Sequence, residues 1–134
     1  MLVTRSESLQ VRSSDDVVRV RQQVRALSLE AGLSLVDQTK IVTAASELAR
    51  NMLDYGGGGS ASVELVQDGI RRGLRLTFED QGPGIPDIQL ALKDGYSTGT
   101  GLGLGLGGAK RLSNEFSIES KPGAGTKIVI ARWK

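Results

Sequence analysis

Residues 74–79 carry the pattern that most limits how this chain can fold. Apolar and polar side chains alternate there, in the order Leu74, Arg75, Leu76, Thr77, Phe78 and Glu79. In an extended strand, alternate side chains point to opposite faces of the sheet. One face of this sheet is therefore buried and the other meets water, so helices must cover the buried face. With 134 residues the chain can build one such core, and we expect a single domain spanning residues 1–134.

The flanking segments supply the other elements. The "SSDD" at 13–16 offers an N-cap for a first helix, and Gly32 offers its stop. Ser34 and Asp37 resemble a capping box that opens a second helix to about Tyr55. The other expected elements are a strand at 8–11, two strands joined around 68–73, a short helix at 86–92, a helix at 106–114 and strands at 116–121 and 126–133. These predict a two-layer α/β (α+β) sandwich, with a mixed, mostly antiparallel sheet and helices on one face.

The amino-acid composition excludes several kinds of catalytic and metal site. The chain contains neither cysteine nor histidine, which excludes disulfides, thiol nucleophiles, the usual zinc sites and imidazole catalysis. Any general base must then be a carboxylate or a lysine. The net charge of +2 is scattered along the chain and does not indicate nucleic-acid binding. Because no apolar run is long enough for a bilayer and the N-terminus lacks a signal-peptide core, we expect a soluble cytoplasmic protein without a membrane partner.

Glycine is concentrated in residues 97–111, "STGTGLGLGLGGAKR". The segment is not a P-loop, because Ala109 interrupts the required Gly-Lys pair. The pattern G-x-G-x-x-G fits 103–108, but it does not follow the first strand of a parallel βαβ unit. What remains is an amide-rich loop before a helix, suited to an anion, or else a plain surface loop. A second run, "GGGGS" at 56–60, resembles an engineered linker, but neither side of it makes a complete domain, so we interpret it as a native loop.

Three smaller patterns each allow two interpretations. Glu47 and Asn51 lie four residues apart on one helical face, beside the apolar stripe and thus at the edge of the core. That stripe consists of Ile41, Ala45, Leu48 and Met52. A carboxylate and an amide oxygen there suit a proton acceptor and a hard cation, or they are ordinary surface residues. Asp80, in "EDQGPGI", could accept a hydrogen bond from a ligand amine or simply cap a turn. The "GAGT" at 123–126 is equally explained by a hairpin turn.

Taken together, these patterns are more specific because of their order. They are Glu-x-x-x-Asn at 47–51, Asp-x-Gly-x-Gly at 80–84, "GTGLGLG" at 99–105 and Gly-x-Gly-Thr at 123–126. This order resembles the Bergerat ATP-binding fold of the GHKL superfamily, which includes histidine kinases, gyrase and Hsp90-type ATPases. The small size is similar to that of the anti-sigma-factor serine/threonine kinases. "TAASELARN" and "EDQGPGIPDI" resemble the stressosome switch kinases among them.

The resemblance implies ATP and Mg²⁺ as cofactors and a role for each matching residue. Asp80 would accept a hydrogen bond from the adenine amino group. Asn51 would ligate Mg²⁺, and Glu47 would act as the general base. The other implied nucleotide-binding residues are Gly82, Gly84, Gly101, Leu102, Gly103, Gly105 and Thr126.

The resemblance also implies a partner-switching function. The kinase would phosphorylate a serine or threonine of a STAS-domain protein and then bind a downstream output protein such as a PP2C-type phosphatase. The alternative is a nucleotide-gated anti-sigma factor or phosphatase-activating module with incidental catalysis. Plain ATP hydrolysis, as in larger relatives, is disfavoured. A histidine kinase is excluded because the chain has no histidine.

Overall fold

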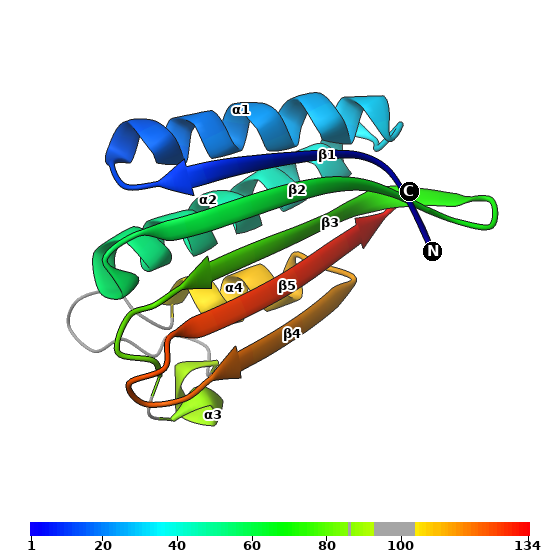
Figure 1. The fold of residues 1–134 in the computed structure, drawn as a ribbon. Helices are drawn as coiled ribbons and strands as arrows, with labels where there is room; N and C mark the ends of the chain where they lie inside the picture. The colour runs from blue at the N-terminus through cyan, green and yellow to red at the C-terminus, as the bar shows by residue number, and fades with distance from the viewer. Residues whose placement is uncertain (86, 93–103) are drawn as a thin grey trace.

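The computed structural model describes residues 1–85, 87–92 and 104–134. Its elements are, in chain order, β1 (Leu2–Val11), α1 (Ser14–Glu30), α2 (Leu35–Gly56), β2 (Gly59–Asp68), β3 (Arg71–Asp80), α3 (Ile88–Ala91), α4 (Leu104–Arg111), β4 (Glu115–Ser120) and β5 (Thr126–Trp133). Figure 1 shows two layers, with α1, α2 and α4 on the same side of the sheet. The expected two-layer sandwich is confirmed.

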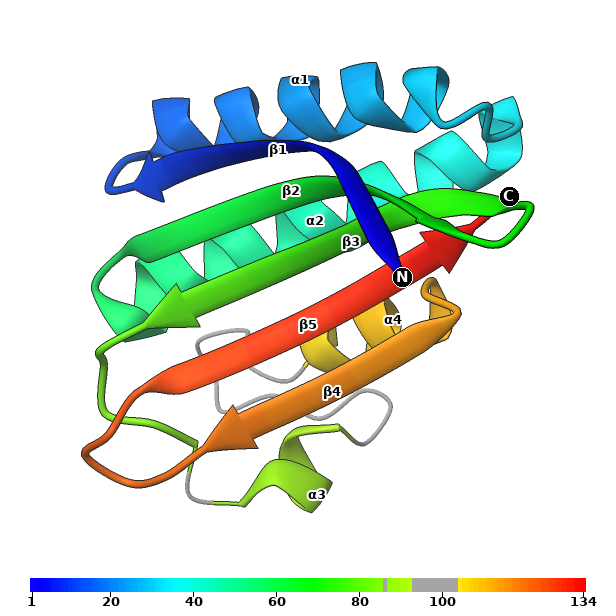
Figure 2. The same cartoon turned by 45° about the vertical axis from the view of Figure 1, so that its right-hand side comes forward.

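The sheet has five strands in the order β1-β2-β3-β5-β4, as Figure 2 shows, and all neighbouring strands are antiparallel. Leu76 of β3 pairs with Val63 of β2 and with Ile130 of β5, and all three side chains are fully buried beneath the helices. On the opposite face, Arg75 Nε lies 2.8 Å from Glu64 Oε1. The alternation in residues 74–79 thus separates a core face from a solvent face, as expected.

The helices follow their caps and apolar stripes. Ser34 Oγ accepts a hydrogen bond from the Asp37 N–H at 3.1 Å, as the capping pattern predicts. Ser13 is the N-cap residue of α1, but its side chain makes no capping hydrogen bond. The predicted stripe of α2 is buried in full: Ile41, Ala45, Leu48 and Met52. Within the described segments, no helix is both long and apolar enough to cross a bilayer.

Several boundaries differ from the sequence expectation. Strand β1 begins at Leu2 instead of residue 8, because it pairs with β2 from Leu2 onward while its exposed side chains show no alternation. Helix α4 ends at Arg111 instead of residue 114, because the Asn114 N–H bonds to Ala131 O in the sheet. Helix α3 covers only Ile88–Ala91, and the expected start of this helix at residue 86 lies outside the described residues.

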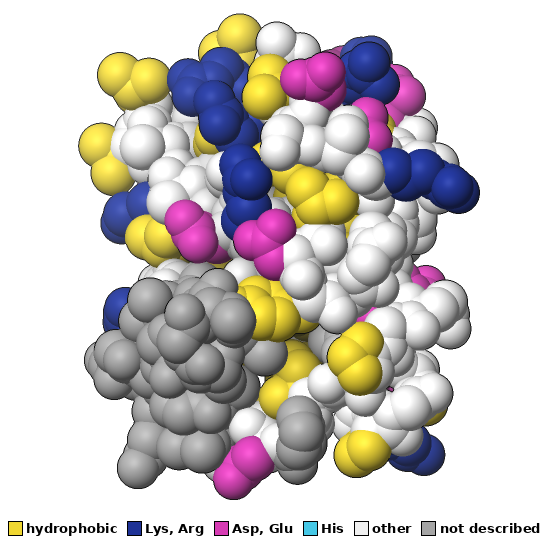
Figure 3. All heavy atoms as spheres, turned by 90° about the vertical axis from the view of Figure 1, so that its left-hand side faces the viewer, with side chains coloured by type: hydrophobic (Ala, Val, Ile, Leu, Met, Phe, Trp, Pro, Cys, Tyr) yellow, Lys and Arg dark blue, Asp and Glu magenta, His cyan; other side chains and the backbone are white. Residues whose placement is uncertain are grey.

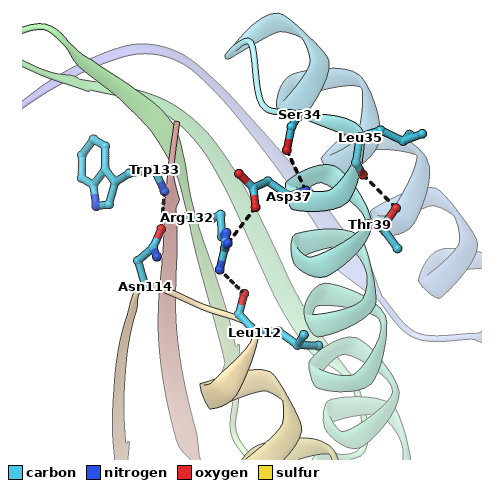
Figure 4. A network of polar contacts seen from close by, with 8 residues as sticks. All are labelled: Ser34, Leu35, Asp37, Thr39, Leu112, Asn114, Arg132 and Trp133. Carbon is cyan, nitrogen blue, oxygen red and sulfur yellow. Dashed lines mark hydrogen bonds and ion pairs between the residues drawn. The ribbon is translucent and has the colours of Figure 1, made fainter.

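Arg132, near the end of β5, joins α2 and the segment after α4 to the sheet (Figure 4). Its Nη2 donates to Asp37 Oδ1 at 2.7 Å, in the first turn of α2, and its Nη1 donates to Leu112 O at 3.2 Å, just after α4. The Arg132 side chain is only 13% exposed. The ion pair therefore holds the start of α2 on β5, and the hydrogen bond to Leu112 holds the segment after α4 there.

Replacing Asp37 by asparagine is expected to lower the free energy of unfolding by about 1 kcal/mol at pH 7. The hydrogen bond from Arg132 lowers the pKa of Asp37 below its ordinary value of 3.8. A lowered pKa stabilises the fold above the unfolded-state value, and the contribution is lost as pH falls through the folded-state pKa. In urea unfolding, the difference in free energy of unfolding between wild type and Asp37→Asn should therefore shrink below about pH 4. Asp68→Asn, at the exposed end of β2, is the control and should show no comparable difference.

Candidate functional site

A pocket opens at the end of the sheet where α2 and β3 end and β5 begins. Antiparallel pairing brings these ends together, because Asp80 pairs with Gly59 on one side and with Thr126 on the other. The atom-free space at this end, which includes open solvent at the mouth of the pocket, is about 450 Å³. Figure 3 views the molecule from this end and shows hydrophobic side chains inside a hollow near its centre. The apolar lining residues are Leu48, Met52, Phe78, Ile85, Leu106 and Ile128, and the polar ones include Asn51, Asp80 and Thr126.

Asp80 places a carboxylate in this largely apolar pocket. Its Oδ1 accepts a hydrogen bond from the Gly82 N–H at 2.9 Å. Burial raises the pKa of Asp80 above 3.8, and hydrogen bonds from the backbone of Gly82 and Thr126 oppose that rise. Because water competes poorly in such surroundings, the carboxylate can bind a ligand N–H group strongly. Gly82 does not line the pocket, and its observed contact is with Asp80.

The end of α2 approaches Asp80 very closely. A Cβ on Gly56 would lie 2.4 Å from Asp80 Cγ and 2.6 Å from its Oδ2. Only glycine therefore lets the helix end and the carboxylate occupy the same wall of the pocket. From the sequence, Gly56 is expected to lie in a linker-like loop. The structure shows that it is the last residue of α2 and a lining residue of the pocket.

Replacing Gly56 by alanine is expected to weaken about tenfold the binding of ATP, the nucleotide that the sequence resemblance implies, because the new methyl group must displace the Asp80 carboxylate. The fold should persist, because alanine is a better helix residue than glycine. Gly108→Ala is the matched control, since a Cβ on this α4 residue would meet nothing within 4 Å. Titration calorimetry with ATP measures both variants. Equal affinities for the two variants would contradict the steric account.

The loop after Asp80 packs against the turn before β5. Gly84 has φ +78, and a Cβ there would lie 2.1 Å from Lys121 O. The Gly123 N–H donates to Pro83 O at 2.7 Å. The two glycine patterns predicted separately, at 80–84 and at 123–126, are thus parts of one structure. Of their residues, Pro83, Gly84 and Thr126 line the pocket beside Asp80.

Ser120 bonds to both of these segments. Its Oγ accepts a hydrogen bond from the Ile85 N–H at 2.7 Å and lies 2.8 Å from Thr126 Oγ1. It also donates to Gly125 O at 3.1 Å. Sequence reasoning missed this residue because Ser120 lies in an expected strand and outside every motif. The alternation of Phe116, Ile118 and Ser120 toward the helix face was the available signal.

Glu47 and Asn51 occupy different environments on α2. Asn51 is half-buried and lines the pocket, as the edge position predicts. Its Nδ2 is buried and has no hydrogen-bond partner among the described residues. Glu47 is exposed and does not line the pocket. The expected edge-of-core position is therefore wrong for Glu47, which is exposed although Leu48 next to it lines the pocket.

The residues present fit a Mg²⁺ ion that arrives with phosphates. Within residues 1–85, 87–92 and 104–134, no group of three or more His, Cys, Asp or Glu could hold a metal by itself. Mg²⁺ commonly binds through one or two protein oxygens, substrate phosphates and water. Asn51 lines the pocket, and its buried Nδ2 has no hydrogen-bond partner among the described residues, so the side chain can turn its amide oxygen to such an ion.

The glycine-rich segment is described only from residue 104 onward. The predicted binding residues Gly101, Leu102 and Gly103 lie outside the described residues. Gly105 lies in the first turn of α4, and Leu106 after it is buried in the pocket. Leu106, Met52 and Tyr55 are lining residues that the sequence analysis did not assign to the site. The 3.6-residue period on α2 could have indicated Tyr55, one turn after Asn51.

Comparisons with known proteins show which family has this fold and sequence. Residues 36–134 match the family described as histidine kinase-, DNA gyrase B-, and HSP90-like ATPase. The chain is 47% identical over 118 residues to the serine/threonine-protein kinase RsbT of Bacillus subtilis (strain 168), covering 88% of this chain and 89% of that protein.

Two solved structures share the fold. The RsbU and RsbW domains of a Mycobacterium tuberculosis protein give a TM-score of 0.67 at 23% identity, covering 96% of this chain but only 32% of that longer chain. A chain of the SiaB–SiaC complex from Pseudomonas aeruginosa gives a TM-score of 0.58 at 10% identity. The match covers 98% of this chain and 91% of that chain. The chain therefore belongs to the histidine kinase-, DNA gyrase B- and HSP90-like ATPase family and, within it, to the serine/threonine-protein kinases related to RsbT.

Proposed function

We propose that this chain transfers the γ-phosphate of ATP to a serine or threonine of a STAS-domain protein, as a partner switch in a bacterial stress or sigma-factor response. The 47% identity to the kinase RsbT supports the reaction class. One observation carries the assignment to this pocket. Asp80 on β3 and Asn51 on α2 line the same largely apolar cavity, and the buried Nδ2 of Asn51 has no partner in the part of the chain that the structure describes. Such a cavity suits a purine ring, with one acceptor for its amino group and one ligand for a cation.

The proposal gives each residue a role in binding. Asp80 accepts a hydrogen bond from the adenine amino group, with Gly82 holding the carboxylate. Gly84 and Thr126 form the purine walls. Asn51 holds Mg²⁺, which supplies neutralisation of phosphate charge when it is bound. The backbone amides around residues 101–105 bind the phosphates near the start of α4, where the helix N-terminus favours an anion.

The reaction is an in-line displacement at the γ-phosphorus. The acceptor hydroxyl oxygen forms a bond to phosphorus while the bond to the bridging oxygen of ADP breaks. Glu47 takes the hydroxyl proton. In a chain without histidine, a carboxylate is a sufficient base, because phosphoryl transfer depends mainly on positioning and charge neutralisation. The exposed position of Glu47 on α2 leaves it accessible to a hydroxyl on another protein.

The partner switch then depends on release of the kinase from the phosphorylated STAS-domain protein. Phosphorylation adds a charge of about −2 to the STAS-domain surface, which changes its fit to the kinase. The released kinase binds an output protein, such as a PP2C-type phosphatase, in the cytoplasm. The relation to RsbT supports this choice of partners.

Incubation with γ-labelled ATP, Mg²⁺ and a STAS-domain protein encoded beside the gene tests the proposal. We expect acid-stable label on a serine or threonine of the STAS-domain protein, and EDTA should prevent it. A nucleotide-gated anti-sigma factor or phosphatase-activating module would bind ATP and its partner without transferring label. That result would replace the kinase proposal with the binding-module alternative.

A further inference from the structure

The hydroxyl of Ser120 forms hydrogen bonds with two residues that line the proposed purine pocket, Ile85 and Thr126. Ser120 ends the edge strand β4 and pairs with Thr126. Its Oγ accepts from the Ile85 N–H at 2.7 Å and contacts Thr126 Oγ1 at 2.8 Å and Gly125 O at 3.1 Å. Ile85 and Thr126 line the pocket, whereas Ser120 does not. Ser120 therefore acts on a ligand in this pocket through these neighbours.

The single proton of the Ser120 hydroxyl limits how its three hydrogen bonds can form at the same time. A serine hydroxyl has one proton and two lone pairs. The Ile85 N–H occupies one lone pair. If Ser120 donates to Gly125 O and accepts from the Thr126 hydroxyl, all three contacts are made. If Ser120 instead donates to Thr126, Gly125 O loses that hydrogen bond. The first arrangement directs the Thr126 proton toward Ser120, so Thr126 Oγ1 presents only lone pairs to the pocket.

We propose that Ser120 is a positioning residue for purine selection: it holds Thr126 as a hydrogen-bond acceptor beside the Asp80 carboxylate. Asp80 and Thr126 are paired residues on adjacent strands, so their acceptors face one region of the pocket. A 6-amino purine offers two donors to this pair. A 6-oxo purine offers an oxygen, which two acceptors repel. This inference rests on the proposed function, which places the purine in this pocket.

Titration calorimetry of Ser120→Ala with MgATP and MgGTP tests the inference. Without the hydroxyl, the nearly buried Ile85 N–H loses its partner and the Thr126 proton is free to turn toward the pocket. We expect the Kd for ATP to rise about tenfold and the Kd for GTP to change less than about threefold, so selectivity for ATP falls. Phosphoryl transfer at saturating ATP should keep its kcat, because Ser120 does not contact the reacting atoms.

Three further variants separate positioning from simple folding. Ser120→Thr keeps the hydroxyl and should restore ATP affinity to within about threefold. Ser117→Ala makes the same change at an exposed position of β4 and should leave both affinities unchanged. Thr126→Val removes the acceptor itself, and adding Ser120→Ala to it should lower ATP selectivity no further.

The outcomes distinguish this inference from the proposed function. If Ser120→Ala binds ATP like wild type, or loses ATP and GTP affinity in equal proportion, the inference is overturned. If wild type binds ATP selectively but transfers no phosphate, the kinase proposal fails while the Ser120 result still decides the inference. A wild-type chain that binds neither nucleotide would overturn both.

Discussion

Asp80→Asn should reduce the affinity for ATP about a hundredfold, the largest binding effect expected from any single change in the pocket. The amide keeps the shape of the carboxylate but replaces a charged acceptor by a weaker one. It also brings an NH₂ group that can face the adenine amino group, donor against donor. The pocket around Asp80 is largely apolar, so water cannot compensate for the mismatch.

The same substitution should leave the ligand-free fold at least as stable as wild type. Burial raises the pKa of Asp80 above 3.8, which means that the charged form is disfavoured in the folded state. A group with a raised pKa destabilises the fold above the unfolded-state value, and removing its charge relieves that cost. Binding and stability therefore change in opposite directions. Calorimetry with ATP and urea unfolding without it measure the two effects.

The pH dependence of binding provides a second test on the wild-type chain. ATP affinity should decline as pH falls through the raised pKa of Asp80, at a higher pH than an ordinary aspartate would require. Asp80→Asn should lack this decline. Asp68→Asn, at an exposed site on the other end of the sheet, should bind ATP like wild type. Unchanged ATP affinity in Asp80→Asn would remove the adenine assignment.

The fold was predictable where one physical rule governed a segment. The two-residue period of 74–79 identified the buried face because each inward side chain meets helices and each outward one meets water. Ser34 was predictable as a cap because its contact with Asp37 is local. The first half of β1 was not, because an edge strand with exposed side chains carries no periodic signal. Its position depends on pairing with β2, which is a long-range contact.

The candidate site likewise contains residues that local motifs predicted and contacts that no local pattern predicted. Asn51, Asp80, Gly84 and Thr126 belong to short motifs, and the structure brings all four to one pocket. The contacts that hold them there join distant segments and have no local signature. The Gly56 approach to Asp80 and the Ser120 hydrogen bonds are examples. A glycine in a run of four and a serine in a strand each have simpler local explanations, so only the tertiary structure reveals these roles.

Glu47→Gln should lower phosphoryl transfer to the protein substrate by a factor of about 10²–10⁴ while ATP affinity stays within a few-fold of wild type. The separation follows from position, since Glu47 lies outside the pocket that contains Asp80 and cannot take part in purine binding there. Glutamine keeps the size and the helical propensity of the residue and removes only its ability to accept a proton.

Single-turnover transfer at saturating ATP, together with calorimetry, measures the two quantities for Glu47→Gln and for a control. Glu119→Gln makes the same chemical change on an exposed strand position and should leave both unchanged. If Glu47→Gln lost ATP affinity in proportion to its rate, the residue would be a binding group and the general-base role would be wrong. If its rate were unaffected, another carboxylate or a lysine must take the proton, because the chain has no histidine. A selective loss of rate would instead assign the proton transfer to the exposed side of α2, where a hydroxyl of another protein can approach.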